Sequence, residues 1–509
     1  MTSSQSRGAN PNTDVEDSLD SMGPPVPKKQ VIKKPLNDKL DIERHELEEY
    51  LPYFFKLIEE CDFVTLDFEF TGVGNNPTGG RVDRNNRPTL AERYKEQRES
   101  AEVYRIMEMG ICPVKWNPAS EFGPGYAVRP FNFPISPFVG TGLCDYDRVL
   151  SFSAQALHFH AKNEFDFNKL FYKGCIYLGH EEEAHIRMLR QQRDEADKIE
   201  IEAKPEDVPM LEDVKAQILA WEKRKSRIGC NEESVNIVRE ELFNGYQRRL
   251  IHQYIRREFP DLIGIWLERG QKHFVVRPYD PEREQKILER QRARFEKAIK
   301  GQRGLRLLID KIMETKKPLV GHNLFTDLIY LHRMFIGTPP EDVEGFRKSI
   351  NQHFGQIVDT KFLALNLDHS NRDVVSSSLP ELGNKFANQA YPRIEDNYIF
   401  MNKARDHIAS YDAWNTAQCF VKLASLMYHA GSDNPTPPRE ASPLIDNRKR
   451  EIAAALATRP PRAGYSRLVE MELSDKTKIR FPHWSSNFWK VFGGRLIVNG
   501  TIEGEFTLI

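Results

Sequence analysis

The sequence predicts an α/β fold: a domain built on a mixed β-sheet and interrupted by a small α+β module. Three observations lead to this prediction. Helical and strand-like periodicities alternate over residues 43–135, the composition becomes densely charged between about 180 and 300, and strands and helices alternate again from 318. A helix, then a strand, then further strands that run antiparallel to it are typical of a mixed sheet with helices on its faces.

The composition indicates a soluble globular protein but does not indicate what it binds. Hydrophobic residues make up 39% and charged residues 29% of the 509 residues, which is typical of a soluble globular protein. The net charge of -1 neither supports nor excludes nucleic acid, because a local basic groove is enough to bind phosphates. The sequence has no apolar run near the ~20 residues that span a bilayer. We expect a soluble, intracellular protein whose six scattered cysteines are reduced.

The main domain is expected to begin with a helix near 43–62, followed by the apolar strand FVTLDFEF at 63–70. Apolar residues recur along that helix at helical spacing: Leu47, Leu51, Phe54, Phe55 and Ile58. Later strands and helices of the same domain are expected at 106–114, 126–135, 318–323, 324–336, 355–367 and 410–429.

The module is expected between the two halves of this domain. Residues 211–228 and 235–259 have the pattern of amphipathic helices, and strand-like segments follow at 263–268 and 272–278. A charged helix after 280 then leads back to the main domain. A small inserted α+β unit explains this order best.

Asp67 and Glu69 lie two residues apart on the predicted strand 63–70. Successive side chains of a strand point to opposite faces, so these two carboxylates share one face. Like charges repel on a buried strand and burial disfavours their ionisation, and a divalent cation relieves both costs. An Asp-x-Glu pair on a strand is a weak signal by itself, because a solvent-facing pair is more common.

Two further acidic residues stand at predicted helix starts. Asp327 follows the strand that ends in Gly-His-Asn, at the edge of the sheet where open α/β sheets bind ligands. Asp412 falls in the first turn of the long helix, with Ser410 as the expected N-cap. His407 lies five residues before Asp412, about 140° away on one helix. It can therefore share a site with Asp412 only from a bend before the helix.

The ordered set Asp67, Glu69, Asp327, His407 and Asp412 resembles the DEDD exonuclease superfamily in its histidine-containing variant. The chain is more closely similar to the poly(A)-specific ribonuclease family. The resembling segments cover about 50 to 430 in family order: FVTLDFEFTG, FDFNKLFYKGCIYL (165–178), FNGYQRRLIHQYI (243–255), LVGHNLFTDLIYLH, IVDTKF and HIASYDAWNTAQCFVKLAS.

The resemblance implies a ribonuclease-H-like sheet, an inserted module of the Arg-x-x-x-His type, and a homodimer. Arg248 and His252 match the Arg and His of that module, which is expected either to bind single-stranded nucleic acid or to support dimerisation. Chain boundaries follow: a disordered tail (1–36), the exonuclease domain in two parts (37–179 and 281–432), the module (180–280), a linker (433–464), and a shortened C-terminal segment like an RNA-recognition fold (465–509). That segment lacks the aromatic RNA-binding signature, so Trp484 and Trp489 are expected in a core or dimer contact.

The hypothesis for chemistry is two-metal-ion hydrolysis of RNA from its 3′ end. Asp67 is expected to bridge two Mg²⁺ ions, Glu69 and Asp412 to complete one site, and Asp327 to hold the other through water. His407 is expected to take a proton from the attacking water. Mn²⁺ is expected to substitute for Mg²⁺. Further RNA contacts are expected at the backbone of Thr71 and Gly72, and at His322 and Lys361, with plain surface exposure an equal alternative for Lys361.

Several alternatives stay open on the sequence. Substrates are either poly(A) tails, as in the wider family, or precursors of piRNA and other small RNAs, as in relatives with a reduced C-terminus. If the substrates are small-RNA precursors, a small-RNA-binding protein of the Argonaute type is expected as a partner. The rival class is a catalytically weak RNA-binding scaffold, and a DNA exonuclease is a third. A cytoplasmic location, with RNA granules and a nuclear fraction, is expected.

Overall fold

The computed structural model describes residues 40–74, 87–120, 123–139, 146–196, 199–225, 233–237, 244–266, 274–367, 377–387, 389, 392–395, 407–430 and 481–508. The tail expected at 1–36 and the linker expected at 433–464 lie outside these residues.

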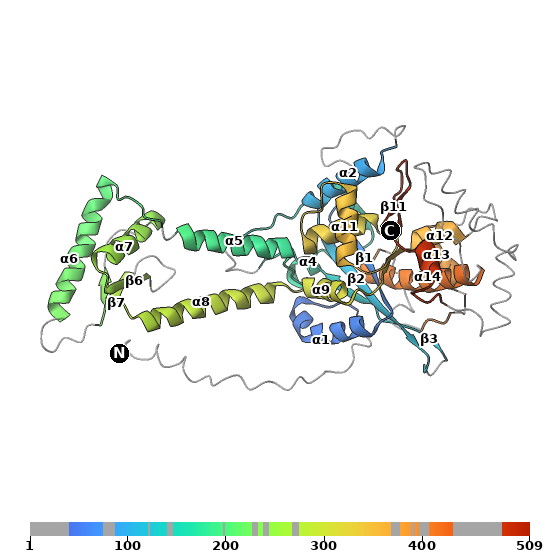
Figure 1. Ribbon diagram of the computed structural model, residues 1–509, viewed down its shortest axis with the longest axis horizontal. Helices are drawn as coiled ribbons and strands as arrows, with labels where there is room; N and C mark the ends of the chain where they lie inside the picture. Colours follow the sequence, from blue (N-terminus) through green and yellow to red (C-terminus); the bar gives the residue numbers. More distant parts are fainter. Residues whose placement is uncertain are drawn as a thin grey trace, which may run out of the picture. The chain divides into compact units, whose positions relative to one another are not determined.

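The main sheet has the strand order β3-β2-β1-β8-β9, with β4 paired to β2. Figure 1 labels β1, β2 and β3 of this sheet. The strands of the sheet are β1 (Phe63–Phe70), β2 (Ile106–Asn117), β3 (Gly125–Val128), β4 (Phe131–Pro134), β8 (Leu319–Gly321) and β9 (Ile357–Asp359). The central strand β1 is antiparallel to β2 and parallel to β8, and β8 is parallel to β9. This mixed sheet confirms the predicted ribonuclease-H-like α/β fold.

Helices surround the sheet; those near 43–62, 324–336 and 410–429 were expected, and most of the others were not predicted from the sequence. They are α1 (Arg44–Glu60), α2 (Leu90–Val103), α3 (Ala154–Lys162), α4 (Asn168–Tyr172), α9 (Arg306–Thr315), α10 (Phe325–Leu331), a π turn (His332–Ile336), α11 (Val343–His353), α12 (Thr360–Leu367), α13 (Leu379–Ala387) and α14 (Ala409–Ala430). The expected helix near 43–62 is α1, and Leu47, Phe54 and Ile58 form its buried face.

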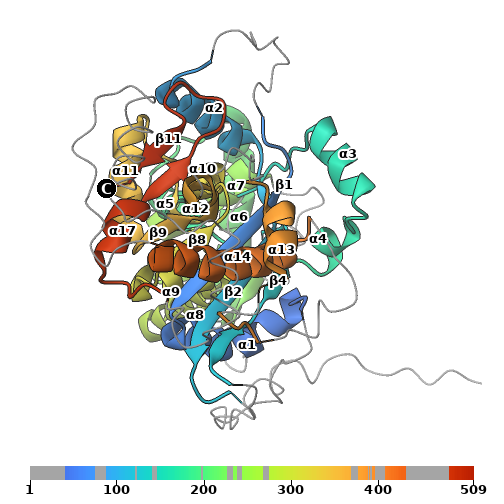
Figure 2. The same cartoon turned by 90° about the vertical axis from the view of Figure 1, so that its right-hand side faces the viewer.

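Helix α14 crosses the face of the sheet over β1 and β2 (Figure 2). The Thr65 hydroxyl on β1 donates a hydrogen bond to the carbonyl of Ala413 at 2.7 Å. Gly110 on β2 permits the close approach, because a Cβ there would lie 2.0 Å from the carbonyl oxygen of Ala409. The helix start is therefore held directly against β2 and against β1, the strand that carries Asp67 and Glu69.

Residues 481–508 pack on the core of the main domain. They contain α17 (Asn487–Phe492) and a hairpin of β10 (Arg495–Ile497) and β11 (Glu505–Thr507). Trp489 is buried in the cluster that also contains Phe420 of α14, and it stacks on Trp484 at 4.6 Å between ring centroids. Both tryptophans thus lie against the main core.

The inserted segment contains a three-stranded antiparallel sheet in the order β5-β7-β6. Figure 1 labels β6 and β7 of this sheet beside α6 and α7. The elements of the segment are a short 3-10 turn (Pro205–Asp207), α6 (Val208–Lys225), β5 (Val235–Ile237), α7 (Gly245–Glu258), β6 (Leu262–Trp266) and β7 (Phe274–Pro278). The prediction of one helix over 235–259 was wrong at its start. Val235 and Ile237 are buried on one face of β5, while α7 begins after the Asn244 N-cap, whose side chain accepts from Gln247 N.

Two long helices, α5 (His180–Ala196) and α8 (Pro281–Gln302), flank the inserted segment in the chain. Near their main-domain ends, the buried Glu183 accepts hydrogen bonds from three arginines. These are Arg187, Arg303 and Arg306. Burial tends to raise the pKa of Glu183, but the three arginines outweigh it and lower the pKa to about 2.

Candidate metal centre

Asp67 and Glu69 lie on one face of β1, as the strand period requires. Burial and the charge of Asp412 raise the pKa of Asp67 well above its usual range, with further contributions from Asp327 and Glu69. Glu69 is 8% exposed, and burial, followed by neighbouring carboxylates, raises its pKa in the same way. The two carboxyl groups therefore stand among like charges with little water to screen them.

Asp327 lies in the first turn of α10, directly after the strand β8. The bend between them passes through Asn323, which has a positive φ of 65°. The Asn323 backbone N–H donates to the Asp359 carboxylate at 2.8 Å, which holds this bend in place. Burial, and after it the charge of Asp359, raises the pKa of Asp327 to about 7.

His407 occupies a bend before α14 with a positive φ of 68°. Its backbone N–H donates to the Asp412 carboxylate at 3.2 Å. The prediction of Ser410 as N-cap was wrong, because the helix begins at Ala409 and Ser410 lies inside its first turn. A positive φ is strained for a non-glycine residue. In this conformation the His407 backbone N–H faces the Asp412 carboxylate.

The structure brings Glu69, His407 and Asp412 together: one ligand-type atom from each lies within 4.8 Å of the others. Asp67 and Asp327 are close enough for their charges to act on the same group. Carboxylate oxygens with an imidazole nitrogen suit a divalent cation, which would neutralise the crowded charges. Glu69, His407 and Asp412 thus form a cluster whose donor set fits a metal ion, and the charges of Asp67 and Asp327 act on the same carboxylates.

Glu108 is a further member of this region that the sequence analysis missed. It lies opposite Glu69 in the β1–β2 register and is only 4% exposed. Its carboxylate accepts from Asn132 Nδ2 at 2.7 Å and from Ala409 N at 3.2 Å. The sequence did offer a sign of its importance, because Glu108 is the single charged residue in the otherwise apolar segment IMEMGICPV. Glu108 links β2 to the start of α14.

His160 on α3 is a second residue that was missed, and no pattern in the sequence distinguishes it. It is 3% exposed. Its Nε2 lies 3.0 Å from the carbonyl oxygen of Phe70, so Nε2 carries the proton and donates. Its Nδ1 lies 3.8 Å from Glu69 Oε2. Burial lowers the pKa of this imidazole.

Four residues near the cluster were expected to contact RNA: Thr71, Gly72, His322 and Lys361. Thr71 is buried; its hydroxyl accepts from Arg105 N and its carbonyl from Ser153 N. The Gly72 carbonyl accepts from the Tyr330 hydroxyl at 3.1 Å. His322 Nδ1 lies 2.8 Å from the Thr360 hydroxyl, and burial, followed by the charge of Lys361, lowers its pKa to about 4. Lys361 is partly buried at the start of α12.

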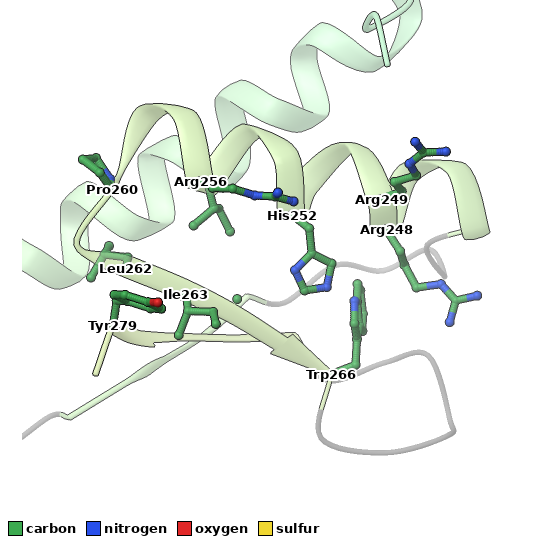
Figure 3. Close-up of a pocket in the computed structure, with 11 residues that line it drawn as sticks. Arg248, Arg249, His252, Arg256, Pro260, Leu262, Ile263, Trp266 and Tyr279 are labelled. Carbon is green, nitrogen blue, oxygen red and sulfur yellow. The ribbon is translucent and has the colours of Figure 1, made fainter. Parts of the chain in front are cut away.

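Arg248 and His252 lie on α7, in the inserted segment, and line a cavity of about 860 Å³. In Figure 3, His252 and Trp266 point toward each other across it, with ring centroids 6.4 Å apart. The Arg248 guanidinium lies 5.8 Å from the centroid of the Trp266 ring. Arg249, Arg256 and Tyr279 also line the cavity. Cationic and aromatic groups therefore face one hollow.

Comparison with known families identifies the class to which this fold and cluster belong. The sequence model of the family described as CAF1 family ribonuclease matches residues 42–420 of this chain. The chain belongs to the CAF1 ribonuclease family. This match confirms the resemblance inferred from the motifs.

Individual relatives have low sequence identity. The poly(A)-specific ribonuclease PARN of Xenopus laevis is 26% identical over 408 residues, covering 76% of this chain and 63% of its own length. That of Arabidopsis thaliana is 26% identical over 453 residues, covering 77% and 63%. The pre-piRNA 3′-exonuclease trimmer of Bombyx mori is 26% identical over 420 residues, covering 79% and 74%. The chain thus spans less than two thirds of the length of the two PARN relatives.

A solved structure of S. pombe Pop2p with Mg²⁺ and Mn²⁺ bound is 14% identical, with a TM-score of 0.35, and the match covers 76% of this chain and 92% of that one. Within the described residues, no helix combines the length and the apolar character needed to cross a membrane.

Proposed function

We propose that this protein is a divalent-metal-dependent 3′-to-5′ exoribonuclease that trims single-stranded RNA. The observation that carries the proposal is the convergence of Glu69, His407 and Asp412, with ligand atoms within 4.8 Å of one another, beside Asp67 and Asp327. Membership of a ribonuclease family supports it independently.

The proposal assigns a role to each side chain. Asp67, Glu69, Asp327 and Asp412 hold Mg²⁺, with Mn²⁺ as a substitute, because hard oxygen donors suit both. Bound Mg²⁺ supplies positive charge at the scissile phosphate and at the departing 3′ oxygen. His407 accepts the proton of the attacking water, and its backbone bond to Asp412 holds the imidazole in position.

The experiment is a trimming assay on 5′-labelled RNA with Mg²⁺, using an A-tailed and a mixed-sequence oligonucleotide. Asp67→Ala serves as the inactive control. Equal stepwise shortening of both RNAs, lost in the control, supports a small-RNA trimmer. Strong preference for the A-tail supports a deadenylase, and shortening of a matched DNA oligonucleotide instead would support a DNA exonuclease.

If neither RNA is shortened, the result favours the alternative that the protein is a catalytically weak RNA-binding scaffold. That alternative requires the chain to bind RNA while Asp67→Ala has no effect on its cellular role. The presence of all five cluster residues weighs against it. Buried carboxylates that raise one another's pKa are costly, and such groups are typical of catalytic sites rather than of binding scaffolds.

We propose further that the cavity beside Arg248 and His252 binds single-stranded RNA. Its lining combines three arginines with Trp266 and Tyr279. Arginines neutralise phosphates, and aromatic rings stack on bases without reading their sequence. The alternative role for this segment is homodimerisation, in which the same residues would face a second copy.

Arg248→Ala combined with Arg256→Ala tests this second proposal. Arg257→Ala on the same helix is the matched control, because Arg257 pairs with Glu258 and does not line the cavity. Binding of a labelled RNA should weaken in the double variant and keep its strength in the control. Unchanged RNA binding together with loss of a dimer in light scattering would favour the dimer role.

A further inference from the structure

Helix α8 carries a row of basic side chains along one side. The members recur every three or four residues: Arg283, Lys286, Arg290, Arg294 and Lys297. At about 100° of rotation per residue they fall within an arc of about 80°, and they extend about 21 Å along the helix axis. All of them are exposed. We call this set the basic stripe.

The acidic residues of α8 lie outside the basic stripe. All are about 80° or more from the centre of its arc: Glu282, Glu284, Glu289 and Glu296. Two of them have partners on other elements, because Glu284 pairs with Arg277 and Glu296 pairs with Arg187. Within the described part of the chain, no member of the stripe forms an ion pair. Its positive charge is therefore not neutralised there by direct contact.

Packing of the helix does not explain the basic stripe. The buried residues Phe295 and Ile299 pack with Ile186 of α5, and they lie on the opposite side of α8, about 140° to 180° from the centre of the arc. Like charges three or four residues apart repel one another on a helix. An ordinary solvated face usually mixes both signs of charge, which avoids this cost. A row of a single sign therefore indicates an anionic ligand.

The basic stripe begins next to the cavity that Arg248 and Arg256 line. Tyr279 lines the same cavity. The next residue, Asp280, is the N-cap of α8, and its carboxylate accepts from the backbone N–H of Arg283, the first member of the stripe. At the other end of the helix, Ile299 packs in the cluster that contains Leu178 and Ile186. The stripe thus leads from the cavity along the helix that returns to the main domain.

We propose that the basic stripe of α8 is a phosphate track for single-stranded RNA that continues from the cavity. The proposal rests on the proposed function. Arginine and lysine neutralise backbone phosphates without reading the base sequence. RNA is favoured over an anionic membrane or an acidic protein, because the stripe adjoins a cavity that combines arginines with aromatic rings. The track would hold the part of a long RNA that lies 5′ of the nucleotides being removed.

The test measures how the binding of a single-stranded RNA of about 30 nucleotides depends on salt. Binding is measured in Ca²⁺, whose variable coordination disfavours hydrolysis, and a gel verifies that the RNA stays intact. The stripe variant combines Arg290→Gln with Arg294→Gln. The matched control combines Arg292→Gln with Lys300→Gln, which removes two charges from exposed positions of the same helix outside the arc. Glutamine keeps the helix propensity close to native, and circular dichroism verifies the fold.

The two double variants should differ although their net charges are equal. Each phosphate contact with single-stranded RNA adds about 0.7 to the slope of log Kd against log salt concentration. The stripe variant should therefore lose about 1.4 from this slope and bind about 25-fold more weakly at about 0.1 M salt. The control should keep the native slope and stay within about 2-fold of the native affinity, because charges without direct contact are largely screened.

The proposal is overturned if the stripe variant keeps the native slope, or if both double variants lose the same amount. A stripe variant that keeps the native slope but no longer binds vesicles containing phosphatidylserine would assign the surface to an anionic membrane instead. The trimming assay in Mg²⁺ separates these outcomes from the proposed function. A native protein with a stripe-dependent slope and no trimming would lose the nuclease and keep the track. Trimming by a protein whose slope is unchanged in the stripe variant would remove the track alone.

Discussion

The Glu108 carboxylate accepts a hydrogen bond from the backbone N–H of Ala409 at 3.2 Å. Glu108 belongs to β2, opposite Glu69, whereas Ala409 begins α14. The bond therefore joins the strand pair that carries Asp67 and Glu69 to the helix that carries Asp412. Because it is buried, its loss would leave an unpaired backbone donor beside the cluster.

Glu108→Ala should lower kcat on RNA by about 100-fold, since displacement of catalytic groups by about 1 Å has effects of that order. Glu108→Gln keeps an oxygen that can accept from Ala409 N, so it should stay within about 5-fold of the native enzyme. Steady-state kinetics with circular dichroism as a folding check provide the measurement. Equal activity of the Ala and Gln variants would contradict a positioning role.

Asp67→Asn should make the metal-free protein more stable while it abolishes trimming. Burial and neighbouring charges raise the pKa of Asp67, so a neutral isostere removes an unfavourable charge. The unfolding free energy should therefore rise, because the amide keeps the shape of the carboxyl group without its charge. Urea unfolding without divalent ions measures it.

Added Mg²⁺ should raise the melting temperature of the native protein and have a much smaller effect on Asp67→Asn. Asp213→Asn, a change at an exposed position of α6, serves as the control and should leave both measurements near native values. A destabilised Asp67→Asn variant would show that Asp67 has a favourable partner in the fold rather than repulsive neighbours.

Glu183→Gln should lower the unfolding free energy by roughly 3 kcal/mol at pH 7, because it replaces the charged acceptor shared by three arginines with one neutral amide oxygen. The pKa of Glu183 falls from 4.5 to about 2 on folding. Its contribution is therefore complete above pH 4.5 and is lost as the pH falls toward 2.

The difference in stability between native protein and Glu183→Gln should accordingly shrink as the pH is lowered through that range. Glu296→Gln is the matched control, because Glu296 also pairs with Arg187 but its side chain is 47% exposed. Its effect should stay below about 1 kcal/mol. A difference that stays constant with pH would exclude the ionised carboxylate as the source.

Asp359→Asn should destabilise the protein by about 2 kcal/mol and loosen residues 481–508. The Asp359 carboxylate accepts from Asn323 N, Lys361 N and Ile497 N, and an amide offers only one oxygen to these donors. Asn499→Ala, which removes an exposed bond to Asn323, is the control. Limited proteolysis should cut the C-terminal segment faster in Asp359→Asn alone.

Much of the fold and the acidic cluster was predictable from local rules. Strand alternation alone places Asp67 and Glu69 on one face, and the carboxyl edge of the sheet accounts for Asp327. The bend at His407 was also inferable, because five residues on a continuous helix would separate it from Asp412. Its positive φ was not, since it accompanies a hydrogen bond from the His407 backbone N–H to the Asp412 carboxylate that forms only in the folded chain.

The remainder depends on contacts between distant segments, which a single sequence does not display. Glu108 and His160 act through Ala409 and Phe70, far away in the chain. Val235 and Ile237 fitted a helical pattern, but pairing with β7 favours a strand. Ser410 was misassigned because helix ends are uncertain by a residue or two.

The packing of residues 481–508 has a consequence for the time at which activity begins. Translation delivers Asp67, Asp327 and Asp412 before α17 and the strand β10, whose Ile497 binds Asp359 beside the Asn323 bend. Domains generally fold as units. Under the proposed function, a nascent chain paused before residue 481 should therefore hold every acidic residue of the site but lack the Ile497 bond to Asp359, and should trim RNA more slowly than the full chain.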